Sequence, residues 1–406
     1  MAINRRLAFT VGTGIVVLAA IPVLAQRGPT SGPVGRYDMR AGTVSGFAAM
    51  GGGMGGAMSM AFGGGGDKIK HELLLRLGSS QGPSSGAPKA DHFMPAGAKL
   101  GKSVALVTPA QERGPADQLP GQRDGQKPSG RLLVFWGCGE HAPKGQPVVI
   151  DFARLSAGQM PPGLWSATVL RDWGPTLQNS KTFGRWPAED GKTVKAESSL
   201  LGAHRVAGSY TPEMTFTLTQ DFMAPLKTTS TSNPSGSSKL SWNAVPAATG
   251  YLAFLFGGKM APGGQLGDMV MWTSSASRQF GGGLSDWLTP AQVAGLVRER
   301  TVMAPATTSC TIPAEVRSAG ADFRIGMLTA FGPEEDFAYP QRPADLKAAW
   351  NLQWTARVRH RSTTSWMDMP GMAGMNEQNA QDPQQPKKCK PKGLGGLLGA
   401  AIGAPC

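Results

Sequence analysis

The chain has 406 residues and a formal net charge of +13, and its 56 glycines and 32 prolines indicate many turns and linkers. The positive charges are scattered singly apart from "KKCKPK" at 387–392, which argues against a nucleic-acid surface. The four cysteines form no CxxC, CxxCH or Cys/His cluster, which argues against zinc, haem and thioredoxin chemistry.

Residues 1–25 have the pattern of a signal peptide. Arg5 and Arg6 precede an apolar run of 18 residues, and "VLA" before Gln26 suits a signal peptidase. We expect cleavage and export, to the periplasm or cell surface of a bacterium; an uncleaved membrane anchor is the alternative. Cleavage leaves 38 Lys+Arg against 27 Asp+Glu. This excess favours anionic envelope components such as lipid phosphates or acidic glycans as partners, or else serves only as a solvated surface.

The next hundred residues contain little sequence that could build a core alone. Residues 26–66 are predicted to be a low-complexity Gly/Met-rich segment. Residues 67–130 are predicted to hold short strands separated by Gly/Pro-rich linkers. Within them, "IKHELLLRL" places Ile69, His71 and three leucines on one face of a strand.

Strand signals become regular in residues 131–228, which are predicted to form a β-sandwich-like region. "RLLVFWGC" is a continuous apolar run typical of a strand buried on both faces. "MTFTLTQDF" alternates Met214, Phe216 and Leu218 with threonines.

A second β-sandwich-like region is predicted for residues 229–362. A helix near 290–300 interrupts it, since Thr289, Pro290 and Gln292 form an N-cap, a first-turn proline and a capping box. "WNLQWTARVR", 350–359, alternates apolar and polar residues and predicts a half-buried strand. The predicted fold class is therefore all-β, with two β-sandwich-like regions and disordered Gly/Pro/Met-rich flanks.

"SGSSKLSWNAVPAATGYLAFLFG", 235–257, resembles the start of fibronectin type III domains, and "FRIGMLTAFGPE", 323–334, resembles a later strand of that family. The resemblance covers roughly residues 229–360. It implies that Trp242 is the core tryptophan of the second strand and that Tyr251 opens the third. Such domains are mostly spacers or binding modules, so the resemblance implies a non-catalytic role.

Four cysteines in an exported chain are predicted to be oxidised, and they allow three pairings. Their positions along the chain favour Cys138–Cys310 and Cys389–Cys406.

No catalytic constellation is found, so we expect no enzymatic activity and no cofactor. The carboxylates Glu140, Asp151, Asp172, Glu189 and Asp190 lie in predicted loops, but their spacing pairs no two of them, as a glycosidase would require.

Trp165, Trp173 and Trp186 fall within 22 residues. They either stack on sugars, as the ligand residues of a carbohydrate-binding protein, or fill the core.

The tail, residues 363–406, is predicted to be flexible. Its Met367, Met369, Met372 and Met375 provide soft thioethers that suit Cu(I), or are adaptable filler. The stretch 387–406 joins lysines to a short apolar run, which favours either peripheral contact with a membrane or a disordered tail.

The sequence thus predicts an exported envelope protein with a structural or binding role, whose partner is an anionic envelope component or another envelope protein. Periplasmic Cu(I) binding and carbohydrate binding are the alternatives.

Overall fold

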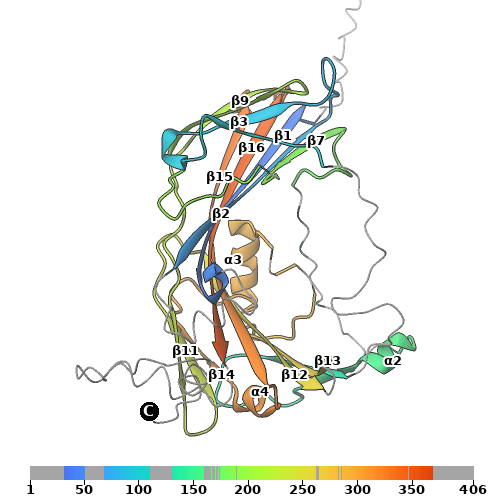
Figure 1. Ribbon diagram of the computed structural model, residues 1–406, viewed down its shortest axis with the longest axis vertical. Helices are drawn as coiled ribbons and strands as arrows, with labels where there is room; N and C mark the ends of the chain where they lie inside the picture. The colour runs from blue at the N-terminus through green and yellow to red at the C-terminus, as the bar shows by residue number, and fades with distance from the viewer. Residues whose placement is uncertain are drawn as a thin grey trace, which may run out of the picture.

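The computed structural model describes residues 32–50, 68–109, 130–159, 166, 170, 172, 174–188, 190–261, 265–281, 283–284, 286–345 and 347–368. One twisted sheet of nine strands runs through the molecule (Figure 1). Its strands are, in spatial order, β6 (Val148–Asp151), β5 (Arg131–Trp136), β13 (Gln265–Thr273), β12 (Gly250–Ala261), β15 (Phe323–Tyr339), β16 (Trp354–Asp368), β1 (Gly35–Gly46), β2 (Ile69–Ser79) and β7 (Thr182–Trp186). Neighbouring strands are antiparallel except for β1 with β16 and β5 with β13, which are parallel.

Two smaller sheets cover different ends of the nine-stranded sheet. The four-stranded sheet has the order β4 (Ser103–Ala105), β3 (Ala90–Phe93), β8 (Gly202–Gly208) and β9 (Thr211–Leu218). The three-stranded sheet has the order β10 (Thr228–Ser232), β11 (Ser238–Trp242) and β14 (Ser309–Ile312). The described helical elements are short: η1 (Phe47–Met50), η2 (Ala96–Ala98), α2 (Phe152–Ser156), α3 (Pro290–Arg298) and α4 (Ala314–Ser318). The chain is therefore all-β, as predicted, and its two sandwich-like layers share one sheet.

The four-stranded sheet packs on the large sheet through alternating apolar residues. Leu73, Leu75 and Leu77 of β2 are buried on one face, as the period of two predicts. They meet Met214 and Phe216 of β9, and further side chains from β1, β16 and β8 complete this first core.

The connection from β9 to β10 continues along the same face, where the side chains of the large sheet become polar. The hydroxyl of Thr43 donates to the carbonyl oxygen of Met223 at 2.6 Å, and that of Ser45 donates to the carbonyl oxygen of Leu226 at 2.5 Å. These bonds satisfy backbone groups that would otherwise be buried without partners. The sheet thereby holds the crossing segment between its two sandwich-like layers.

The three-stranded sheet packs on β12, β13 and β15 around a second core. Trp242 of β11 and Tyr251 of β12 are 6% and 0% exposed, and their ring centroids lie 5.7 Å apart. The predicted disulfide Cys138–Cys310 is present and links the end of β5 to β14.

The strand order of this second layer agrees in part with that of immunoglobulin-like sandwiches. Such sandwiches place the first, second and fifth strands in one sheet and the third, sixth and seventh in the other. Counted from β10, the chain agrees with this order for six strands: β10, β11 and β14 form one sheet, and β12, β15 and β16 lie in the other. It differs at the fourth strand, because β13 pairs with β12, whereas the constant-type order places the fourth strand with the first, second and fifth.

Helix α3 packs on the opposite face of the large sheet (Figure 1). Thr289 caps it, and both hydrogen bonds of the predicted capping box with Gln292 are formed. Val293 and Leu296 are buried against Leu252 and Phe331. No helix within the described ranges is long and apolar enough to cross a membrane.

Several predicted boundaries are wrong because strands from different regions pair with one another. Residues 35–46 were expected to be low complexity but form β1, in the interior of the sheet between β16 and β2. β7, from the first predicted sandwich, pairs with β2, whereas β5 pairs with β13 of the second. β16 extends to Asp368, so residues 363–368 belong to a strand and not to the tail. Cross-strand pairing over such sequence distances leaves no local signal.

Candidate functional site

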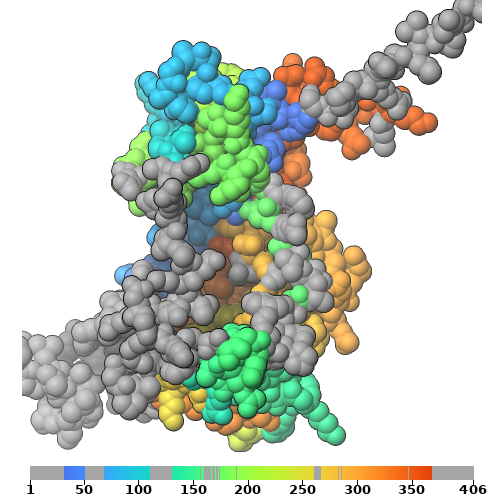
Figure 2. All heavy atoms as spheres, turned by 90° about the vertical axis from the view of Figure 1, so that its right-hand side faces the viewer, coloured from blue at the N-terminus to red at the C-terminus, as the bar shows by residue number. Residues whose placement is uncertain are grey.

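The face of the large sheet that carries α3 becomes charged beyond that helix. Along β1, β2, β15 and β16, side chains on this face lie in rows set by the strand register. One row is Arg76, Asp38, Arg357 and Asp336, and the next holds Arg40, Arg359 and Glu334. We call the set Asp38, Arg40, Arg76, Glu334, Arg357 and Arg359 the arginine face. Seen from this side, the molecule is hollowed at mid-height, and the blue of β1 and β2 and the orange of β16 lie at the bottom of the hollow (Figure 2).

Asp38 lies at the centre of the arginine face and is 1% exposed. It accepts hydrogen bonds from Arg40 Nε at 2.8 Å, Arg359 Nη2 at 2.7 Å and Arg357 Nη2 at 3.3 Å. A buried carboxylate is tolerated only when it is paired in this way. Asp38 of β1 therefore binds two arginines of the neighbouring strand β16 through a single side chain.

A second carboxylate, Asp172, reaches the arginine face from outside the sheet. Its Oδ2 accepts from Arg40 Nη2 and from Arg76 Nη1, the latter at 3.0 Å, and its Oδ1 lies 3.4 Å from Arg359 Nη2. Burial works to raise the pKa of Asp172, but the hydrogen bond and charge of Arg40, with Gly174 N–H and Arg359, hold it well below its usual range. Asp172 is therefore a charged partner of three arginines.

The residues after Asp172 lie against β1 and β2. A Cβ on Gly174 would come within 3.2 Å of Asp38 Oδ2 and 3.4 Å of Arg40 Nη2, so a side chain there would crowd the ion pair of Asp38 and Arg40. Arg36 donates to the carbonyl oxygen of Asn179 at 2.7 Å and to its Oδ1 at 2.9 Å. These contacts fix the backbone that carries Asp172.

Glu334 and Trp287 complete the surroundings of Arg359. Glu334 Oε2 lies 3.9 Å from Arg359 Nε, and burial, with the charge of Asp336, raises the pKa of Glu334 to about 7 although Arg357 and Arg359 oppose the shift. Arg359 Nη1 donates to the carbonyl oxygen of Trp287. The indole of Trp287 in turn lies 4.0 Å from the guanidinium of Arg361, a cation–π contact.

The arginine face was not predicted from the sequence, although the sequence contains one signal of it. The alternation in "RVRHR", 357–361, placed Arg357 and Arg359 on the polar face of the predicted strand. The strand was predicted to be half-buried, with its apolar face inside and its polar face outside, whereas Arg359 on the polar face is 3% exposed. Asp172 was considered only as one of several loop carboxylates.

Of the tryptophans and methionines predicted as site residues, only Trp186 and Met367 are described, and neither belongs to the arginine face. Trp186 is 3% exposed in the first core, and its Nε1 donates to Asp190 at 3.1 Å, so it offers no exposed ring to a sugar. Met367 lies in β16 opposite Ile325. Trp165, Trp173, Met369, Met372, Met375, Cys389 and Cys406 lie outside the described residues. Among the described residues, no three His, Cys, Asp or Glu side chains are grouped to hold a metal.

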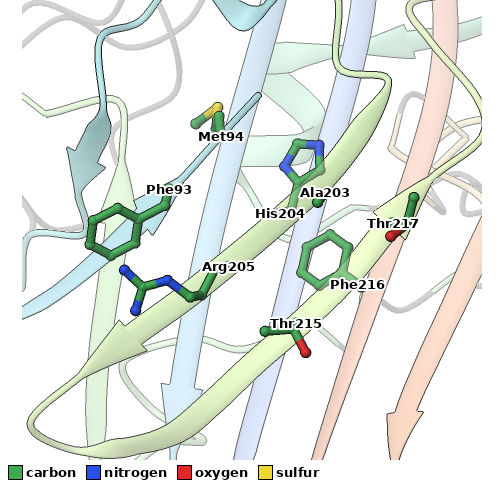
Figure 3. Close-up of a pocket in the computed structure, with 8 residues that line it drawn as sticks. All are labelled: Phe93, Met94, Ala203, His204, Arg205, Thr215, Phe216 and Thr217. Carbon is green, nitrogen blue, oxygen red and sulfur yellow. The ribbon is translucent and has the colours of Figure 1, made fainter. Parts of the chain in front are cut away.

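A smaller hollow of about 380 Å³ lies over the four-stranded sheet (Figure 3). Arg205 lies over the ring of Phe93 at 3.9 Å and donates to Glu213 at 2.9 Å. Thr215 and Thr217 form the opposite wall. The guanidinium is therefore already paired and the ring already covered, which leaves this hollow with little to select a ligand.

No protein-family model matches the chain, and comparisons with curated proteins and with solved structures find no significant match. The resemblance to fibronectin type III domains therefore stays a prediction.

Proposed function

We propose that the chain is an exported, non-catalytic binding protein of a bacterial envelope, and that the arginine face takes an anionic ligand. One observation supports this most: Arg40 and Arg359 are opposite each other in adjacent strands, and both are 3% exposed. Like charges directly opposite each other destabilise a sheet. A surface that only needed to be stable would place an apolar pair there.

The charges around this pair favour an anion over a cation or a neutral ligand. Four guanidinium groups, Arg40, Arg76, Arg357 and Arg359, face Asp38 and Asp172. Glu334 adds less than a full negative charge near neutral pH because its pKa is about 7. Asp336, opposite Arg357, is exposed, so solvent screens its charge. Arginine presents a planar fork that matches carboxylate and phosphate groups.

The test is binding of acidic and neutral probes to the full chain. We expect oligogalacturonate to bind with an affinity that falls with salt, and a neutral maltooligosaccharide not to bind. Arg76→Gln removes a guanidinium whose side chain is 30% exposed and should weaken binding about tenfold. Arg205→Gln is the matched control, because that arginine pairs with Glu213 on the other sheet and should not matter.

Vesicles containing phosphatidylglycerol test the phosphate alternative in the same assay. Binding of an anionic probe that is insensitive to Arg76→Gln, or the absence of binding to every anionic probe, would reject the proposal.

Copper and carbohydrate binding remain alternatives without structural support in the described residues. Three of the four methionines and two of the three tryptophans lie outside them, and the third tryptophan, Trp186, is buried.

A further inference from the structure

Two features separate Asp172 from the other carboxylates of the arginine face. The first is its origin: Asp38 and Glu334 belong to strands of the sheet, whereas Asp172 lies in the connection between α2 and β7. The second is its exposure, since the side chain of Asp172 is 23% exposed and that of Asp38 is 1% exposed. The sheet alone therefore presents Arg40, Arg76 and Arg359 as an open set of donors, which Asp172 fills.

The donors around Asp172 form a complete receptor for one planar carboxylate. Arg40 and Arg76 bind Oδ2, while the N–H of Gly174, at 3.0 Å, and Arg359 bind Oδ1. The Nε of Arg359, in a residue that is 3% exposed, lies 3.9 Å from Glu334 Oε2, and neither atom has a hydrogen-bond partner within the described part of the chain. Arg359 is therefore ion-paired with Glu334 on one side and with Asp38 and Asp172 on the other.

We infer that Asp172 occupies the subsite of a ligand carboxylate, and that such a ligand binds by replacing Asp172 between Arg40, Arg76 and Arg359. This inference rests on the proposed function and names its ligand class. Exchange of one carboxylate for another leaves the charge of the buried arginines balanced. Because Asp172 occupies the subsite, the apparent affinity for the ligand equals the intrinsic affinity multiplied by the fraction of time that the subsite is free.

Chemical rescue tests whether the subsite accepts an external carboxylate. Asp172→Ala leaves Arg40 and Arg359 short of a counter-charge and should lower the melting temperature. Sodium acetate should then raise the melting temperature of this variant more than sodium chloride at equal ionic strength does, because a ligand bound only by the folded state stabilises it. Asp268→Ala is the matched control: it breaks an Arg131–Asp268 pair of 2.5 Å between β5 and β13, and acetate should not rescue it.

Asp172→Asn provides the second measurement and keeps the shape of the side chain if Asp172→Ala fails to fold. It should bind oligogalacturonate at least about tenfold more tightly than the wild type, because a neutral amide competes poorly for three arginines. Equal affinity of wild type and Asp172→Asn would overturn the inference but leave the proposed function standing. The absence of binding to both would reject the two together, and acetate that fails to rescue Asp172→Ala would overturn the inference alone.

Discussion

His92 and His204 form a buried hydrogen-bonded chain whose direction follows from its last acceptor. His204 Nε2 lies 2.7 Å from the carbonyl oxygen of Leu200, which can only accept, so Nε2 carries the proton and Nδ1 is an acceptor. His92 therefore donates through Nε2 to His204 Nδ1 at 2.9 Å, and Tyr37 donates its hydroxyl to His92 Nδ1 at 2.6 Å. Burial lowers the pKa of both histidines, which keeps both rings neutral.

Removing the hydroxyl of Tyr37, the first donor of this chain, should lower the free energy of unfolding more than removing another buried hydroxyl does. Tyr37→Phe leaves His92 Nδ1 buried without a partner and should lower the free energy of unfolding by about 1–3 kcal/mol. Tyr210→Phe is the control, because the Tyr210 hydroxyl lies in the same core and has no hydrogen-bond partner within the described residues. Urea unfolding of both variants measures the difference, and equal effects would show that the Tyr37–His92 hydrogen bond adds no net stability.

At the scale of elements, Trp242 on β11 is the largest side chain that the three-stranded sheet contributes to the second core. Trp242→Ala should lower the free energy of unfolding by about 3–5 kcal/mol, because it removes a buried ring and leaves a cavity. Trp242→Phe keeps a ring in place and loses an indole N–H that has no partner among the described residues, so it should cost much less. Denaturant unfolding compares the two, and a small effect of the alanine variant would show that β11 contributes little to this core.

The whole molecule should lose stability in mild acid because of four buried histidines, His71, His92, His204 and His360. Burial is the main cause that lowers the pKa of each. Unfolded histidines take up protons near pH 6.5, so below that pH the unfolded state binds more protons and stability falls as the pH falls. Glu334 opposes this change, because its raised pKa of about 7 makes the folded state bind a proton that the unfolded state does not bind until about pH 4.5.

The net difference is at most about three protons, so stability should fall by up to about 4 kcal/mol per pH unit between pH 6 and 5. Urea midpoints measured from pH 7.5 to pH 5 give this slope. His360→Leu should reduce this slope by up to one proton. A flat profile would show that the buried histidines titrate alike in both states.

The sequence by itself determined the elements whose signal is local. The period of two in β2 and β9, the capping box of α3 and the all-β class all follow from neighbouring residues, and the structure has them. The sequence also favoured the disulfide Cys138–Cys310, although the positions of the cysteines along the chain give no physical reason for one pairing over another.

Only the tertiary structure decided where β1 lies and what the arginines of β16 face. β1 alternates Arg36, Asp38 and Arg40 with apolar residues, a pattern that reads as a solvated face until partners bury it. Its charges can be buried because Arg359 arrives from more than 300 residues away and Asp172 from more than 130. The free energy of a buried charge depends on these distant partners, and no local pattern of residues encodes them.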